Sequence, residues 1–155
     1  MSLSKKEQEI IQTGAKNLEK RCIEARMVGI KMESYGKELI LDIHNCDVSK
    51  FNRIDIERYI RVLCNDVIDM EREDLHWWDY EDDPEGYKEA PSHLKGTSCV
   101  QFIKTSTIVI HSLVDLKKIF IDIFSCKDFD VEEAADFTKN YFSGVIRNKT
   151  GVIRD

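Results

Sequence analysis

The stretch between residues 96 and 126 places the strongest constraint on how this chain can fold. It contains three apolar runs of strand length, separated only by short polar turns, within the blocks 96–112 and 119–126. β-Branched and aromatic residues dominate these runs, and such residues favour strands over helices. The sequence therefore predicts three consecutive β-strands in this part of the chain.

The flanking segments alternate between helical and strand patterns. Apolar residues recur at steps of three and four in residues 4–27 and 53–70, which predicts two amphipathic helices. Asn52 is suited to cap the second of them, and Asp130, with Glu133 three residues later, opens another helix that Gly144 is placed to end. Further strands are predicted at 39–43, at 74–80, and as a terminal hairpin of two short strands around 149–151.

This order of elements predicts the fold class. A largely antiparallel sheet with helices on one face is an α+β two-layer sandwich, and the helix near the amino terminus is added to it. A length of 155 residues is typical of one domain. We expect a single domain over 1–155, made of an N-terminal helical extension (1–35) and an α+β domain (36–155).

Charge and composition narrow the possible partners and location. The net charge of −6 does not favour a nucleic-acid surface, and no apolar run suggests a membrane span or signal peptide. Five cysteines without a C-x-x-C pair fit a reducing compartment, so we expect a cytoplasmic protein. The histidines and cysteines lack the paired spacing of zinc ligands, so no metal is expected.

Four polar residues stand out within the predicted strands. Ser98, Ser106, His111 and Cys126 follow one another at intervals of eight, five and fifteen residues. Taken one at a time, each has an ordinary structural explanation: a hydroxyl in a turn, a hydrogen-bonded histidine in a sheet, a small apolar filler. The combination is more informative than any of its members.

Together, these spacings resemble the prokaryotic type of S-adenosylmethionine decarboxylase, a pyruvoyl-dependent family that cleaves its own chain. The segment 39–47 also resembles the first strand of that family, and the resemblance extends over about residues 36 to 144. Because the family is built as an α+β sandwich and its small members form dimers, the resemblance implies the same fold and a homodimer.

The resemblance also implies a role for each matched residue. The chain would be cleaved between Thr105 and Ser106, and Ser106 would become the pyruvoyl group. Ser98 would assist processing, and His111 would be the processing base, since imidazole titrates near neutrality. Cys126 would donate a proton to the decarboxylated substrate. No ordinary side chain is an electron sink, which is why a decarboxylase of this kind needs a carbonyl cofactor.

The sequence departs from the family pattern around the substrate. Asp115 stands where the family has a glutamate that binds ribose hydroxyls, and it is the predicted substrate-binding residue. The two aromatic positions that stack on adenine in the family are Leu113 and Ser92 here. Because stacking on an aromatic side chain is worth roughly 1–3 kcal/mol per base, their loss would weaken adenine binding by about a hundredfold or more.

Two classes of function therefore remain open. The first is a decarboxylase of polyamine biosynthesis that acts on S-adenosylmethionine, or by the same chemistry on ornithine or arginine. The second is an unprocessed, non-catalytic relative that binds a small molecule or a partner subunit. Neither class requires a nucleic acid or a membrane.

Overall fold

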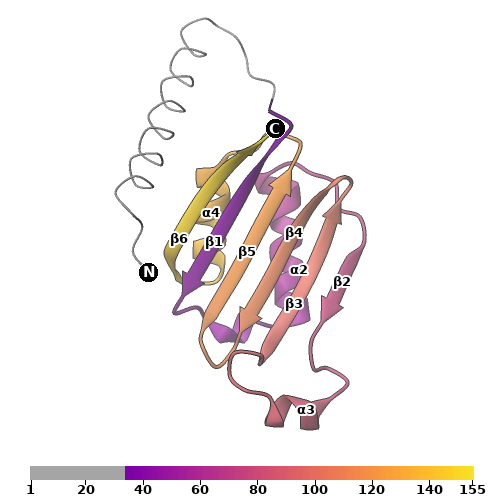
Figure 1. Cartoon of the computed structure of the whole chain (residues 1–155), viewed down its shortest axis with the longest axis vertical. Coiled ribbons are helices and arrows are strands. Elements are labelled where there is room, and N and C mark those ends of the chain that lie inside the picture. The colour runs from indigo at the N-terminus through magenta and orange to yellow at the C-terminus, as the bar shows by residue number, and fades with distance from the viewer. Residues whose placement is uncertain (1–33) are drawn as a thin grey trace, which may run out of the picture. The chain divides into compact units, whose positions relative to one another are not determined.

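A computed structural model describes residues 34–155, which form one compact unit. The helix expected at 4–27 lies outside the described residues. The unit is built on one six-stranded antiparallel sheet in the order β2-β3-β4-β5-β1-β6 (Figure 1). Its strands are β1 (Gly36–His44), β2 (Leu75–Trp78), β3 (Gly96–Ile103), β4 (Ser106–Leu113), β5 (Lys118–Ser125) and β6 (Val145–Arg154).

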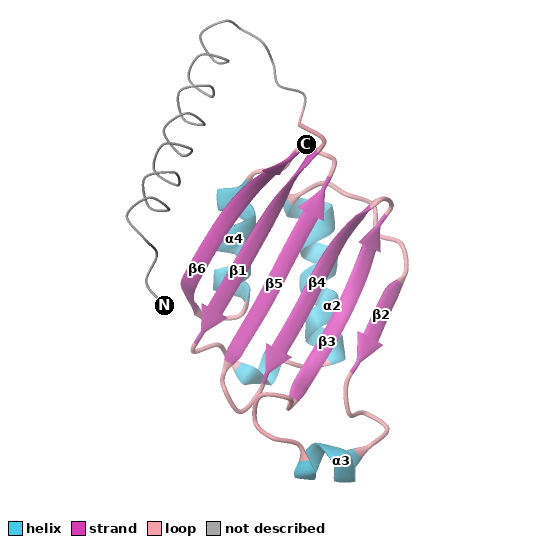
Figure 2. Ribbon diagram, in the orientation of Figure 1, coloured by secondary structure: helices cyan, strands magenta, loops and turns pink. Residues whose placement is uncertain are grey.

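Helices α2 (Arg53–Val62) and α4 (Val131–Tyr141) both lie behind the same face of this sheet (Figure 2). The α+β two-layer sandwich expected from the sequence is therefore confirmed. Two short 3₁₀ and α segments, η1 (Val48–Lys50) and α3 (Pro84–Glu89), lie in the connections. No helix of the described residues is long and apolar enough to cross a membrane.

The three predicted central strands are present and pair in sequence order. The connection from β3 to β4 is a two-residue turn, because Ile103 pairs with Ser106. Such a short turn fixes the register of the hairpin, and it places Ser98 directly opposite His111. The turn from β4 to β5 is also short, so these strands form a meander at the centre of the sheet.

The core lies between the sheet and the two helices. Alternate residues of the central strands point to this side and are fully buried: Leu39, Leu41, Ile43, Ile108, Ile110, Ile119, Ile121 and Ile123. Each such side chain contributes roughly 1.5–3 kcal/mol when it is fully removed from water. Tyr59 of α2 lies at 0% exposure among them, and its hydroxyl is 2.8 Å from Thr138 Oγ1 of α4. This contact ties the two helices together.

The helix predicted over 53–70 changes character after ten residues. Its cap is as expected, because the Asn52 side chain accepts a hydrogen bond from the Asp55 amide. The α-helical part ends at Val62, and one π-helical turn, η2 (Leu63–Val67), continues the chain. Short π turns frequently occur at functional sites, and this one leads into the cavity described below.

The predicted terminal hairpin is wrong. The whole segment Val145–Arg154 is one strand, and it pairs with β1 along its length, with a register shift between Asp42 and Ile43. Thr150 lies opposite Ile40, in the middle of the strand where the turn was expected. The edge of β1 pairs with nine residues of this segment, and these pairs outweigh the local turn preference of a Lys-Thr-Gly sequence.

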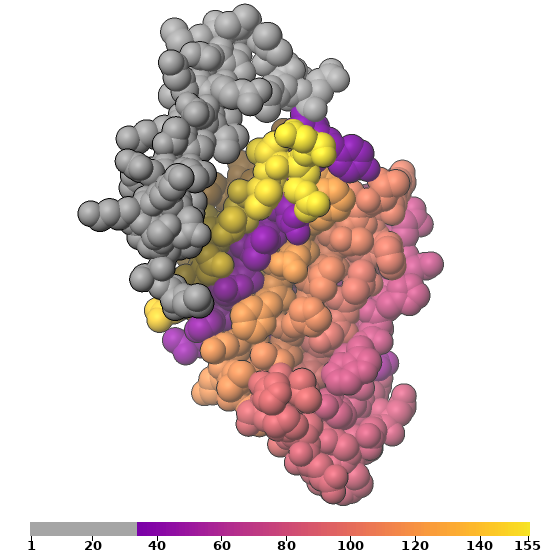
Figure 3. All heavy atoms as spheres, viewed as in Figure 1, coloured from indigo at the N-terminus to yellow at the C-terminus, as the bar shows by residue number. Residues whose placement is uncertain are grey.

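The face of the sheet opposite α2 and α4 carries no described helix. We call it the open face; it is the side seen in Figure 3, where strand side chains form the surface. It presents half-buried apolar residues, among them Phe120 and Phe124 of β5, and the more exposed Trp78 and Phe102. The open face is therefore apolar enough to be a contact surface.

Candidate active site

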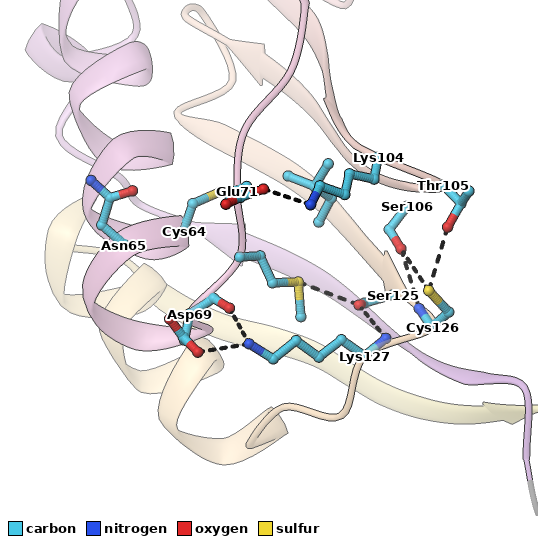
Figure 4. A pocket seen from close by; sticks show the side chains of 12 residues that line it. Cys64, Asn65, Asp69, Glu71, Lys104, Thr105, Ser106, Ser125, Cys126 and Lys127 are labelled. Carbon is cyan, nitrogen blue, oxygen red and sulfur yellow. Dashed lines mark hydrogen bonds and ion pairs between the residues drawn. The ribbon is translucent and has the colours of Figure 1, made fainter.

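Ser106 is the first residue of β4 and is only 2% exposed. Its hydroxyl oxygen accepts a hydrogen bond from the backbone amide of Cys126 at 3.2 Å, and it lies 3.7 Å from the Cys126 sulfur (Figure 4). The neighbouring Thr105 hydroxyl is 3.4 Å from the same sulfur. The structure therefore brings three of the predicted residues together at one end of the sheet.

Cys126 directly follows β5 and is the exposed member of the four described cysteines. Hydrogen bonds with Thr105 and then with Ser106 lower the pKa of its thiol. Burial acts in the opposite direction on the other three and raises the pKa of Cys46 and of Cys64 to about 11 and that of Cys99 to about 12. Since the thiolate is the reactive form, Cys126 is the described cysteine best suited to chemistry.

A cavity of about 580 Å³ opens beside this cluster, which is within the usual range for small-molecule sites. Cys64 and Asn65 of the π turn line its far side, across from Ser106 (Figure 4). Two ion pairs stand at its edge, Lys104 with Glu71 at 2.5 Å and Lys127 with Asp69 at 2.7 Å. A buried hydroxyl and an activated thiol thus share a cavity that a small molecule can enter.

Ser98 and His111 form a second pair, on the open face. The Ser98 hydroxyl and His111 Nδ1 are 2.9 Å apart, within hydrogen-bonding distance. Their neighbours in the same row across the sheet are Trp78, which pairs with Ser98, and Phe120, which pairs with His111. The two residues to which the resemblance assigns processing roles are therefore hydrogen-bonding neighbours across β3 and β4.

The two pairs are not close to each other within one chain. His111 is five positions beyond Ser106 on the same extended strand, and at about 3.3 Å per residue this separates the two by about 16 Å. An odd spacing also directs the two side chains to opposite faces: Ser106 is buried on the helix side, whereas His111 is exposed. Within one chain, the imidazole does not reach the Ser106 α-proton.

Asp115 lies in the turn between β4 and β5, at the end of β4 far from Ser106. Its carboxylate accepts a hydrogen bond from the Ser92 hydroxyl at 3.0 Å and lies 3.8 Å from Lys95 Nζ. The predicted ribose-binding carboxylate therefore already has partners within the protein. Ser92, one of the two positions that lack an aromatic ring, is one of those partners.

Sequence reasoning gave no role to several groups that shape the cavity. The Ser125 hydroxyl donates to the sulfur of Met70 at 3.3 Å and accepts from the Lys127 amide at 3.0 Å, which holds the start of the Cys126 loop. Met70 lies in the connection after the π turn, far from Ser125 in sequence. Strand alternation places Ser125 on the buried face, but no sequence signal links it to Met70.

The described residues contain no group of three or more potential metal ligands arranged to hold an ion. What the fold and the site define is an α+β protein in which a serine hydroxyl and a thiol meet at the mouth of a small-molecule cavity.

Comparison with known proteins identifies the family to which this arrangement belongs. The family model described as S-adenosylmethionine decarboxylase matches residues 37–154, nearly all of the described unit. This chain therefore belongs to the S-adenosylmethionine decarboxylase family.

Individual relatives agree with the family match. The chain is 29% identical over 108 residues to the S-adenosylmethionine decarboxylase proenzyme of Bacillus velezensis, a match that covers 68% of this chain and 75% of the relative. The crystal structure of the adenosylmethionine decarboxylase from Aquifex aeolicus superposes with a TM-score of 0.61. It is 18% identical and the match covers 78% of this chain and 91% of that one, so it supports the fold.

Proposed function

We propose that this protein is a self-processing, pyruvoyl-dependent decarboxylase of polyamine biosynthesis, cleaved between Thr105 and Ser106. The observation that carries the proposal is the contact between the buried Ser106 hydroxyl and the Cys126 thiol beside a cavity. The family and the Bacillus relative, which is named a proenzyme, support both the reaction and the processing. The described cysteines are free thiols, in keeping with the cytoplasmic location that we propose.

Processing would begin at the Ser106 hydroxyl. Its oxygen forms a bond to the Thr105 carbonyl carbon, the carbon–nitrogen bond breaks, and the hydroxyl proton ends on the freed nitrogen of Ser106. A base then removes the α-proton of residue 106, and the Thr105 carboxylate leaves from its Cβ. The remaining enamine takes up water and releases ammonia, which leaves a ketone at position 106. No oxidant, metal or second substrate is required.

The pyruvoyl group would supply the electron sink that decarboxylation needs. The residues around position 106 fit such a group, because its surroundings are buried, polar on one side and open to the cavity on the other. Cys126 would hold a proton at its sulfur, next to position 106, and deliver it to the α-carbon of the substrate. A thiol with a lowered pKa can both release and recover a proton near neutral pH.

We propose that a second copy of the chain completes the site. His111 and Ser98 lie on the open face, and Ser106 is out of their reach in the same chain. Two sheets that pack face to face are about 10 Å apart. The Ser98–His111 pair of one copy would then face the backbone of β4 at position 106 in the other copy, from the side opposite to the Ser106 hydroxyl. A two-fold symmetric homodimer would form two such sites.

The open face is suited to this contact. Partial burial, and then the neighbouring Glu38 carboxylate, raise the pKa of Asp122 at the centre of this face. Around it lie the half-buried Phe120 and Phe124. In the dimer these apolar rings would be removed from water, together with the Asp122 carboxylate between them.

S-adenosylmethionine is the proposed substrate because the family and the Bacillus relative carry that name. One observation favours a second candidate, an amino acid without a nucleoside such as ornithine or arginine. Asp115 is held by Ser92 and Lys95 rather than left open to ribose hydroxyls. Binding of the adenosyl group would require Asp115 to exchange these partners.

Release of labelled carbon dioxide distinguishes these substrates. We expect the purified full chain to release it from carboxyl-labelled S-adenosylmethionine, and a Ser106→Ala variant to release none. Release from ornithine or arginine alone would assign the second candidate. Absence of release from all three, with an uncleaved chain, would contradict the proposed function and favour the non-catalytic relative.

A further inference from the structure

The turn that precedes the proposed cleavage point has an unfavourable backbone conformation. Lys104 and Thr105 are its two central residues, and Lys104 has φ = 59°. In this region the Cβ of an ordinary residue crowds the neighbouring carbonyl. Two-residue hairpin turns with a positive φ at the first central position normally have glycine there. Lysine at this position is therefore strained, one residue before the Thr105–Ser106 bond.

Backbone hydrogen bonds hold the turn in this conformation, and an exposed ion pair lies beside it. Lys104 Nζ pairs with the Glu71 carboxylate, which belongs to the connection before β2. Next to the turn, the Phe102 carbonyl accepts from the Glu73 amide at 2.8 Å, and the Phe102 amide donates to the Asp74 carbonyl at 3.0 Å. The hairpin is therefore fixed on its outer side as well as by β4, and the strain cannot relax while the turn is intact.

We infer that Lys104 is a positioning residue for self-cleavage, because its strained backbone is released when the acyl group moves from nitrogen to oxygen. In that step the bond from Ser106 Oγ to the Thr105 carbonyl carbon forms and the peptide carbon–nitrogen bond breaks. The hydroxyl proton ends on the Ser106 nitrogen. The connection from the Thr105 carbonyl to the Ser106 Cα then passes through Oγ and Cβ and is longer by one bond. The extra bond gives the chain enough length for Lys104 to return to a negative φ.

This inference rests on the proposed function, since it concerns the rate of the same cleavage. A general stabilising role can be distinguished from it, because a second turn of the described chain also has a lysine at positive φ. Lys117 has φ = 50° in the turn from β4 to β5, which contains no proposed cleavage point.

The test follows cleavage of the full chain after pulse-labelled cell-free synthesis, with denaturing gels to separate residues 1–105 from 106–155. Lys104→Ala removes the ion pair but keeps the strain, because alanine also has a Cβ. Lys104→Gly removes both, and Glu71→Gln removes the ion pair alone. Lys117→Gly relieves the positive-φ strain at the control turn. Decarboxylation per cleaved chain is measured in parallel.

We expect Lys104→Gly to cleave about tenfold more slowly than Lys104→Ala, which is the order of effect that release of one strained residue has on a rate. Lys104→Ala, Glu71→Gln and Lys117→Gly should cleave within about twofold of the natural chain. Turnover per cleaved chain should be the same in Lys104→Gly as in Lys104→Ala, because both variants lack the Lys104 ammonium group at the edge of the cavity. Equal rates for the glycine and alanine variants, in a chain that does cleave, would overturn the inference and leave the proposed function standing. A natural chain that never cleaves would overturn both.

Discussion

A mixture of two inactive variants should process itself if the site is shared between two copies. His111→Ala keeps Ser106 but lacks the imidazole, and Ser106→Ala keeps the imidazole but cannot be cleaved. Since His111 is about 16 Å along the strand from Ser106 and on the other face, the missing base has to come from the partner. Neither variant alone should yield fragments.

The expected amount of cleavage follows from pairing statistics. When the two variants are co-expressed in equal amounts and pair at random, about half of the His111→Ala chains have a Ser106→Ala partner. About half of all His111→Ala chains should therefore be cleaved, and no Ser106→Ala chain should be cleaved. Tagging the two variants differently and weighing the fragments by mass spectrometry gives both fractions.

The control is a second mixture, in which both variants also carry Asp42→Lys and Asp122→Lys on the open face. Charge repulsion on that face should prevent pairing and abolish the fragments. Cleavage of His111→Ala by itself would refute the assignment of the imidazole. Absence of cleavage in the first mixture, with mixed dimers shown to be present, would refute the shared site.

Three further outcomes are expected. Cys126→Ala should cleave normally but release carbon dioxide about 10²–10⁴-fold more slowly, the usual cost of losing a positioned proton donor. Turnover per cleaved chain measures this effect, and an unchanged rate would exclude the Cys126 thiol as the proton donor. In the uncleaved Ser106→Ala chain, Thr105 lowers the pKa of Cys126, so iodoacetamide should alkylate this thiol with a midpoint below the ordinary value of about 8.5; Thr105→Val in the same chain should move the midpoint up, and no movement would contradict the assigned cause. Tyr59→Phe should lower the free energy of unfolding in urea by about 0.5–1.5 kcal/mol, because Thr138 keeps its bond to the Ala134 carbonyl; a loss above about 3 kcal/mol would contradict this reading of the contact.

Much of the fold could be predicted because local and global signals agree. The β-branched runs of β3, β4 and β5 lie between turns too short for anything but hairpins, so their pairing follows from the sequence. The caps at Asn52 and Asp130 are set by side-chain hydrogen bonds within three residues. Such features depend on neighbours in the sequence, which a single sequence contains.

The sequence-based predictions fail where contacts between residues far apart in the chain determine the local structure. At the carboxyl terminus, pairing with β1 overrides the turn preference of Lys149-Thr150-Gly151. After α4, the positive φ of 52° falls on Ser143, while the next residue, Gly144, packs too closely against the Ile43 side chain to carry a Cβ. The π turn at Leu63–Val67 has no recognised sequence signal.

The candidate site was predicted as a list of residues but not as an arrangement. The interval of five between Ser106 and His111 matched the family, yet the same interval on a strand already separates the two side chains onto opposite faces. The contact of Ser106 with Cys126, by contrast, depends on how β4 and β5 end, which spacing alone does not reveal.

Intact mass of the purified full chain under denaturing conditions tests the central claim most directly. We predict two species, residues 1–105 and residues 106–155, and the second should carry a ketone in place of its amino terminus. The Ser106→Ala variant should give only the full-length chain. A single species of 155 residues in the natural chain, stable over days at neutral pH, would contradict it.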